Sequence, residues 1–291
     1  NPAYYEAYNN MGITRKDQGK LDEAIEAHNK ALSLNPDYAE SYVNIGNILI
    51  DQGKLDEAIE TFSTALSLNP NVAEACYNLG NVLKAKGKLD EAIEAYNKAL
   101  SLKPDYADAY LNMGTVLQDQ GKLDEAIEAY NKTLSLKPDY AKAYYNMGNA
   151  LKAQGKMKEA VEAFRGALLI DPDNKRAKHM LASVTGEKTE TAPREYVEDL
   201  FDDYAKKFEI SLVNNLQYKT PKLIGNILIK LNDNQALGSV LDLGCGTGLL
   251  GPEIKKYCSK LEGIDLSNKM LAIAKQKNIY DQLSHFDIVE Y

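Results

Sequence analysis

The chain has 291 residues, of which 44% are hydrophobic and 26% are charged, and these values are ordinary for a soluble globular protein. Its net charge of −8 argues against nucleic acid as a main partner, because phosphate binding needs a concentrated basic surface. No apolar run approaches the roughly 20 residues that span a bilayer, so no membrane contact is expected. Three scattered cysteines predict free thiols in a reducing cytoplasm, and three histidines outside any ligand-spaced cluster predict no metal site.

A strict period of 34 residues runs through the first part of the chain, and it is marked by prolines in register at 36, 70, 104, 138 and 172. A period of this length is typical of a solenoid, in which each unit buries its apolar face on its neighbours. Each unit reads as helix, turn and helix. The second helix is clearest in KLDEAIEAYNKALSL (residues 88–102), whose Leu, Ala and Ile residues form one apolar stripe.

Polar residues and glycines mark where the first helices begin and end. Asp37 with Glu40, and Asp105 with Asp108, are expected to cap the first-turn amides and to meet the positive end of the helix dipole. Gly53 is expected to end its helix in the left-handed conformation.

Small residues recur where two helices must approach closely. A glycine inside a helix costs about 1 kcal/mol relative to alanine, so a repeated one indicates a position that needs the missing side chain. These glycines are Gly46, Gly80, Gly114 and Gly148. The alanines expected to oppose them are Ala24, Ala58, Ala92, Ala126 and Ala160.

Large aromatic residues fill the neighbouring slots: Tyr42, Tyr110 and Tyr144 in the first helices, and Phe62, Tyr96, Tyr130 and Phe164 in the second helices. With the glycines, alanines and prolines, they give a pattern that resembles the tetratricopeptide repeat over five full units. Departures from that pattern are Arg15, His28, Cys76 and Thr133. The resemblance implies an all-α superhelix whose first helices line a concave face. We place five repeats and a capping helix (residues 173–184) in residues 1–185.

Asparagines form two rows along the expected concave face. The first row is Asn10, Asn44, Asn78, Asn112 and Asn146, and the second is Asn47, Asn81 and Asn149. A carboxamide both donates and accepts hydrogen bonds, so a row of them can hold an extended peptide backbone of any sequence. Some tetratricopeptide arrays hold peptides in this way, which the resemblance therefore implies here. The alternative is a polar surface residue that was copied with each duplicated unit.

After the repeats, residues 186–193 (GEKTETAP) are polar and predict an interdomain linker. Residues 194–237 predict two amphipathic helices. In the first, Leu200, Phe201, Tyr204 and Phe208 recur at spacings of three and four, and the apolar face of the second consists of Leu223, Ile224, Ile227, Leu228 and Leu231. We interpret Tyr204 and Phe208 as core residues rather than as part of a lid. Residues 238–291 then form the first part of an α/β domain.

The chemistry of that domain begins at residues 239–248, where a short aliphatic strand runs directly into Gly-Cys-Gly-Thr-Gly and a helix expected over residues 249–256. Strand, glycine-rich turn and helix open a nucleotide-binding α/β domain, because missing side chains let a ligand lie against the backbone. A second strand ends in Asp265, whose carboxylate can accept hydrogen bonds from both ribose hydroxyls. Dinucleotides and other adenosine cofactors can both use this geometry.

The spacing G-x-G-x-G in VLDLGCGTG resembles the first motif of class I S-adenosylmethionine-dependent methyltransferases. The resemblance extends to GIDLSNKMLAIAK, to residues 285–287, and to FDDYAKKFE, which is similar to the N-terminal helix that closes over the cofactor. It implies S-adenosylmethionine as the cofactor. The implied contacts are Asp242, Gly244, Cys245, Gly246, Thr247, Gly248, Asp265, Leu266, Met270 and Asp287.

Residues 240–291 have room for about three strands, whereas a domain of this class needs roughly 150 residues. We therefore expect a methyltransferase domain that is cut roughly in half, and a chain that is catalytically inactive by itself. The catalytic residues are unknown and are expected beyond Tyr291. Two hypotheses follow: a methyltransferase whose repeats recruit a protein or peptide, or a non-catalytic scaffold whose repeats bind partners.

Overall fold

The computed structural model describes residues 3–187, 192–215, 217–233 and 235–290. The chain divides into two compact units, the repeat array (Asn1–Lys188) and the C-terminal unit (Thr189–Tyr291). The predicted linker includes residues 188–191, which lie outside the described residues. Within those described, no helix is long and apolar enough to cross a membrane, and no group of His, Cys, Asp or Glu side chains is arranged to hold a metal ion.

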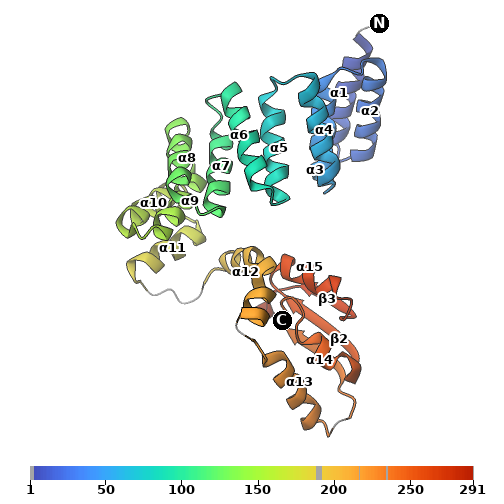
Figure 1. Ribbon diagram of the computed structural model, residues 1–291, viewed down its shortest axis with the longest axis vertical. Coiled ribbons are helices and arrows are strands. Elements are labelled where there is room, and N and C mark those ends of the chain that lie inside the picture. Colours follow the sequence, from blue (N-terminus) through green and yellow to red (C-terminus); the bar gives the residue numbers. More distant parts are fainter. Residues whose placement is uncertain (1–2, 188–191, 216, 234, 291) are drawn as a thin grey trace. The chain divides into compact units, whose positions relative to one another are not determined.

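The repeat array is all-helical, and each helix packs on the next one along the chain (Figure 1). Its helices are α1 (Ala3–Asp17), α2 (Leu21–Leu34), α3 (Ala39–Asp51), α4 (Leu55–Leu68), α5 (Ala73–Ala85), α6 (Leu89–Leu102), α7 (Ala107–Asp119), α8 (Leu123–Leu136), α9 (Ala141–Ala153), α10 (Met157–Ile170) and α11 (Lys175–Thr185). The last helix, α11, covers α10. The side chain of Asn174 caps it by accepting a hydrogen bond from the amide of Ala177.

The nearest side chains to the mid-helix glycines are aromatic rings of the second helices, and the predicted alanines are fully buried on the same helices. A Cβ at Gly46 would lie 2.7 Å from the ring of Phe62, and one at Gly80 would lie 2.6 Å from the ring of Tyr96. Both rings are fully buried. The glycine leaves room for a ring, which reaches farther across the helix pair than an alanine methyl group can. At Gly114 the backbone oxygen of Ala126 also lies within 3.2 Å of the Cβ position.

The ends of the first helices follow the prediction only in part. Gly53 adopts the left-handed conformation with φ of +74°. Glu40 and Asp108 lie in the first turns of α3 and α7 as predicted, but the predicted side-chain caps are wrong, since both helices begin without one. Glu40 instead accepts hydrogen bonds from the hydroxyl of Tyr38 and the side-chain carboxamide of Asn9, and Asp108 accepts one from the hydroxyl of Tyr140 at 2.6 Å. These acids therefore join neighbouring repeats and side chains rather than helix amides.

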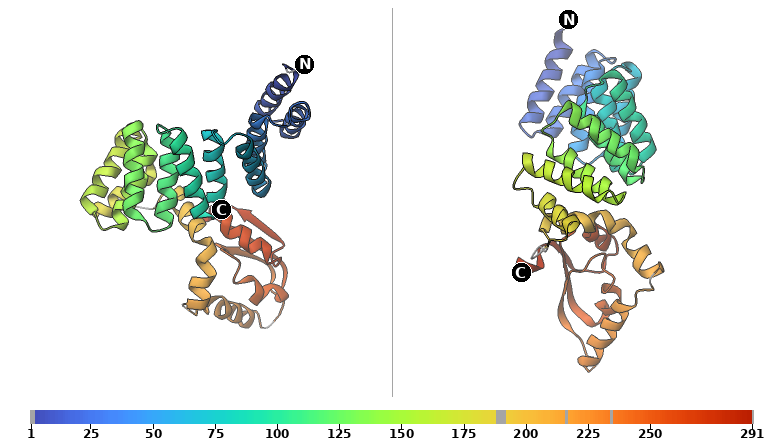
Figure 2. Two further views of the ribbon diagram at one scale, coloured as in Figure 1. Left: turned by 45° about the horizontal axis from the view of Figure 1, so that its top comes forward. Right: turned by 90° about the vertical axis from the view of Figure 1, so that its left-hand side faces the viewer.

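The C-terminal unit is a small parallel sheet with helices (Figure 2). Its elements are α12 (Arg194–Glu209), a π-helical turn (Ile210–Asn215), α13 (Thr220–Leu231), β1 (Gly238–Leu243), α14 (Gly251–Ile254), a 3-10 turn (Lys255–Tyr257), β2 (Cys258–Asp265), α15 (Asn268–Gln276), β3 (Gln282–His285) and a 3-10 turn (Ile288–Glu290). The helix predicted over residues 249–256 is much shorter, with only four α-helical residues.

The strand order is β1-β2-β3, and all neighbouring strands are parallel. The register sets Leu243 beside Ile264 and Asp265 beside His285, so the carboxyl ends of the three strands meet at one edge. Helix α15 packs on β2 and β3 and also contacts α12. This architecture brings the glycine turn after β1, the acid at the end of β2 and one face of α12 to the same place.

Candidate functional site

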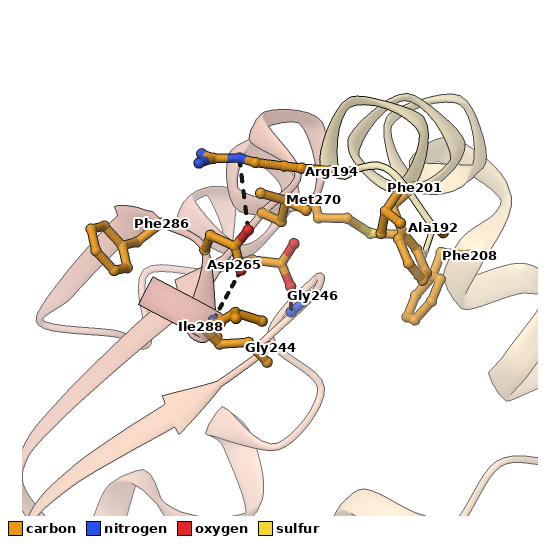
Figure 3. A pocket seen from close by; sticks show the side chains of 14 residues that line it. Ala192, Arg194, Phe201, Phe208, Gly244, Gly246, Asp265, Met270, Phe286 and Ile288 are labelled. Atoms are coloured by element: carbon orange, nitrogen blue, oxygen red, sulfur yellow. Dashed lines mark hydrogen bonds and ion pairs between the residues drawn. The ribbon is translucent and has the colours of Figure 1, made fainter. Parts of the chain in front are cut away.

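A pocket of about 570 Å³ lies within the C-terminal unit at the carboxyl ends of the strands (Figure 3). Small-molecule sites are typically about 300–1,000 Å³, so this pocket is large enough for a cofactor. It is lined by Ala192, Arg194, Val197, Phe201, Phe208, Gly244, Gly246, Asp265, Leu266, Met270, Phe286, Asp287, Ile288 and Val289.

The three glycines of the turn after β1 have two different roles. All three have positive φ, at +73° for Gly244, +54° for Gly246 and +78° for Gly248. A Cβ at Gly244 would meet nothing within 4 Å, and one at Gly246 would meet only the ring of Phe208, at 3.8 Å. A Cβ at Gly248 would lie 2.9 Å from the ring of Tyr280. The first two glycines therefore leave bare backbone facing the pocket, whereas the third makes room for internal packing.

Asp265 connects the end of β2 to the glycine turn. One carboxylate oxygen, Oδ2, accepts a hydrogen bond from the amide of Gly246 at 2.8 Å, and the other, Oδ1, accepts one from the amide of Ser267 at 2.8 Å. The carboxylate is therefore held rigidly at the pocket wall. Each oxygen can accept further hydrogen bonds, because an ionised carboxylate offers about four lone-pair positions.

Leu266, Met270 and Asp287 also line the pocket. Met270 is 1% exposed, and its amide donates to the hydroxyl of Ser267, which caps α15. Asp287 accepts a hydrogen bond from the amide of Val289 and lies 3.9 Å from the Nε atom of Arg194. The structure thus brings six of the sequence-predicted cofactor residues together around one space.

The other four predicted residues lie behind the pocket wall. Asp242 accepts a hydrogen bond from the hydroxyl of Tyr280 at 2.6 Å, and burial raises the pKa of its carboxyl group against the opposing effect of that bond. Cys245 is buried, which raises the pKa of its thiol to about 12 and keeps it protonated. Thr247 and Gly248 are buried as well, and neither lines the pocket.

Helix α12, which the resemblance placed over the cofactor, lines one wall of the pocket, but the residues that form this wall were not predicted. Phe201 and Phe208 of α12 face the pocket, as does Arg194 at the start of the same helix (Figure 3). The interpretation of Tyr204 and Phe208 as core residues was wrong, because Phe208 lines the pocket and Tyr204 is exposed, with its ring edge-on to that of Phe208 at 5.8 Å between centroids. The spacing of seven residues between Phe201 and Phe208 places both on one helix face, but nothing local shows that a pocket lies under that face.

In the repeat array, the two asparagine rows bind each other across neighbouring repeats. The carboxamide of Asn78 donates to Oδ1 of Asn47 at 2.8 Å, and that of Asn112 donates to Oδ1 of Asn81 at 2.9 Å. A second donation from Asn112 reaches the hydroxyl of Tyr77 at 3.0 Å. These pairs therefore give the rows a structural role between repeats.

The first repeat departs from that pairing because Ile13 occupies the second-row position. Asn44 donates instead to Asn9, which is 1% exposed and also accepts a hydrogen bond from Ser41. Sequence reasoning missed Asn9, although it stands where the other repeats carry Val, Tyr, Leu and Tyr. Among described residues, the side chains of Asn10 and Asn146 make no hydrogen bond, and the Oδ1 atom of Asn149 is buried without a partner.

A groove of about 660 Å³ lies in the array where α3 and α5 begin. Its wall combines carboxylates with asparagine side chains. It is lined by Asp37, Tyr38, Ala39, Glu40, Val43, Asn44, Leu68, Asn69, Val72 and Glu74.

Two parts of the chain match two different protein families. Residues 3–192 match the family model of the cilia and flagella-associated protein 70 C-terminal domain, which is a tetratricopeptide-type domain. The chain belongs to this family of tetratricopeptide-repeat domains. Residues 240–290 match a methyltransferase domain family, so the tetratricopeptide array is followed by a partial methyltransferase-type domain with a Rossmann-like sheet.

Solved structures that resemble the chain are tetratricopeptide proteins. A crystal structure of MamA is 36% identical, covers 57% of this chain and 96% of its own, and has a TM-score of 0.53. YrrB, described as a TPR protein with an unusual peptide-binding site, is 27% identical, covers 59% and 89%, and has a TM-score of 0.54. MamA from Desulfovibrio magneticus RS-1 is 23% identical, covers 59% and 97%, and shares the fold at a TM-score of 0.55. No curated protein matches the sequence.

Proposed function

We propose that the protein is an S-adenosylmethionine-dependent methyltransferase whose repeats recruit a protein or peptide partner. The observation that carries this proposal is the bare backbone of Gly244 and Gly246 opposite Asp265 in one pocket. The match of residues 240–290 to a methyltransferase domain supports it. The repeat array, which shares its fold with peptide-binding and other tetratricopeptide proteins, supports the recruiting role.

The residues present fit S-adenosylmethionine. A side chain at Gly244 or Gly246 would fill the space beside the turn, and both positions lack one. Asp265 offers remaining lone pairs to ribose hydroxyls, and Met270 with Leu266 offers an apolar surface for adenine. Phe201 and Phe208 would exclude water from the opposite side.

Bound S-adenosylmethionine supplies an electrophilic methyl group on a sulfonium ion. The residues of this chain bind and orient that donor, because methyl transfer depends largely on the alignment of donor and acceptor. Asp265, held by two backbone amides, fixes the ribose, and the glycine turn fixes the methionine part. No described residue is assigned as a general base, and the methyl acceptor is not identified.

The test is isothermal titration calorimetry of this chain with S-adenosylhomocysteine and its 2′-deoxy analogue. Loss of a hydrogen bond to a charged group costs about 1.5–3 kcal/mol, so the analogue should bind roughly tenfold or more weakly. The Asp265→Ala variant removes both carboxylate oxygens and should bind the two ligands about equally. A variant that still discriminates between the ligands would show that Asp265 does not contact the ribose.

The repeat groove favours a partner with basic side chains. Asp37, Glu40 and Glu74 line it beside Asn44, so an extended peptide can pair its backbone with carboxamides and its Lys or Arg side chains with carboxylates. If the C-terminal unit has no methyltransferase activity, this groove supports the alternative function, that of a protein-binding scaffold. We propose a cytoplasmic location for either case, from the free cysteines.

Peptide binding should respond differently to the two kinds of asparagine. The side chain of Asn146 makes no hydrogen bond within the described residues. Asn146→Ala should therefore weaken the binding of an extended Lys-containing peptide without loss of stability. Asn78→Ala removes a bond between repeats and should lower both affinity and stability, the latter by about 1 kcal/mol. Fluorescence anisotropy with matched Lys and Glu peptides measures affinity. Equal binding of the two peptides would contradict the assigned charge preference.

A further inference from the structure

The middle of α12 is bound to the start of α15 through one carboxylate, that of Asp202. Its Oδ1 atom accepts a hydrogen bond from the hydroxyl of Ser267 at 2.5 Å and another from the amide of Lys269 at 3.1 Å. Ser267 is fully buried, so water does not compete for its hydroxyl. A hydrogen bond to an ionised acceptor is roughly twice as strong as one between neutral groups.

From Ser267 a chain of hydrogen bonds leads to the glycine turn. The amide of Ser267 donates to Oδ1 of Asp265, and the amide of Gly246 donates to Oδ2 of the same carboxylate. The hydroxyl of Ser267 also accepts from the amide of Met270. Asp202 is therefore connected through one residue, Ser267, to the carboxylate at the pocket wall and to the start of α15.

The same helix closes one side of the pocket. Phe201 precedes Asp202, and both Phe201 and Phe208 line the space, with the ring of Phe208 3.8 Å from the position of a Cβ at Gly246. The attachment of α12 to Ser267 therefore determines both the position of these rings and the position of the Asp265 carboxylate.

Another contact attaches α12 without a hydrogen bond to Ser267 or Asp265. Glu209 forms an ion pair with Lys277 at the far end of α15. It provides a matched comparison, since its loss weakens the attachment of α12 but leaves the hydrogen bonds between Ser267 and Asp265 in place.

We propose that Asp202 is a positioning residue for the pocket. It latches the Phe201–Phe208 face of α12 over the glycine turn and, through Ser267, fixes the carboxylate of Asp265. The effect of Asp202 on S-adenosylmethionine binding rests on the proposed function. The attachment of α12 to Ser267 is a property of the unliganded chain.

The first test is hydrogen–deuterium exchange of the unliganded chain. In Asp202→Ala, segments 244–248 and 265–271 should exchange about tenfold faster, because the buried hydroxyl of Ser267 loses its acceptor. Asp202→Asn retains an acceptor oxygen and should stay within about threefold of the unaltered chain, as should Lys277→Met. Unchanged exchange in Asp202→Ala, or equal acceleration in Lys277→Met, would overturn the latch.

The second test adds S-adenosylhomocysteine in stopped-flow or surface plasmon resonance measurements. Asp202→Ala should raise the dissociation rate about tenfold and change the association rate by less than about threefold, since a latch acts after the ligand has entered. A dissociation rate equal to that of the unaltered chain would overturn the positioning role. If no variant binds the ligand but Asp202→Ala still loosens both segments, the proposed cofactor is wrong and the latch stands.

Discussion

His28 occupies the position at which the other second helices carry Phe or Tyr. Its ring is fully buried against Gly12, where a Cβ would lie 2.5 Å from its Nε2 atom. Neither ring nitrogen has a hydrogen-bond partner in the described part of the chain. Burial lowers the pKa of this imidazole from 6.5 to about 4, with Glu40 opposing and Lys16 reinforcing that shift.

The array should therefore lose stability in acid. The unfolded chain binds a proton at His28 below about pH 6.5, whereas the folded chain does so only below about pH 4. The contribution of neutral His28 to the free energy of unfolding is complete above pH 6.5. It falls by about 3 kcal/mol as the pH drops to 4. His28→Phe places at this position the residue found at Phe62, and it should reduce the difference in unfolding free energy between pH 7.5 and pH 5, measured with urea. If the variant keeps the same difference, the loss of stability in acid comes from other groups.

At the scale of the helix pair, the contact between a glycine and a ring determines how closely the two helices of a repeat approach. The ring of Tyr96 cannot move away from Gly80, because its hydroxyl donates to Asn81 at 2.8 Å and the ring is fully buried. Asn81 in turn accepts from Asn112 of the next repeat. One tyrosine thus connects packing within a repeat to the contact between repeats.

Gly80→Ala should destabilise the array by about 1–3 kcal/mol through overpacking against Tyr96. Gly87→Ala is a matched variant, since its Cβ would meet nothing and its cost of about 1–2 kcal/mol would come only from φ of +76°. Adding Tyr96→Leu should recover part of the stability lost in Gly80→Ala and none of the stability lost in Gly87→Ala. Urea unfolding of the single and double variants measures these couplings, and additive costs at Gly80 would exclude a clash.

At the scale of the whole molecule, the chain consists of two units with separate groups of buried residues. Phe62 and Tyr130 are among the buried residues of the array, whereas Ile254, Leu261 and Met270 are buried in the C-terminal unit. The proposed cofactor pocket lies in the second unit alone. We therefore expect binding of the proposed cofactor to stabilise the C-terminal unit.

Differential scanning calorimetry should show that S-adenosylhomocysteine raises only the transition of the C-terminal unit. At a ligand concentration of about 100 times the Kd, the gain is about 2.7 kcal/mol. His28→Phe should move only the other transition. A ligand that shifts both transitions equally would show that the two units unfold as one.

The sequence by itself determined the elements and the families. The 34-residue period places each helix of the array, because every unit repeats the same local pattern of apolar residues, glycine and proline. The run from Val240 to Gly248 likewise predicted strand β1 and a glycine turn, and the match to a methyltransferase domain agrees with it. These features depend on residues close together in the chain, so local spacing is sufficient to predict them.

Only the tertiary structure decided which side chains meet. The ring of Phe62 is the nearest side chain to Gly46, Asp242 binds Tyr280 behind the pocket, and Phe208 lines the pocket instead of the core. Each of these partners lies 16 or more residues away or on another element, and spacing along one helix or strand does not specify such contacts. The physical reason is that packing selects partners by shape and reach in three dimensions, while the sequence pattern shows only which face of an element will be buried.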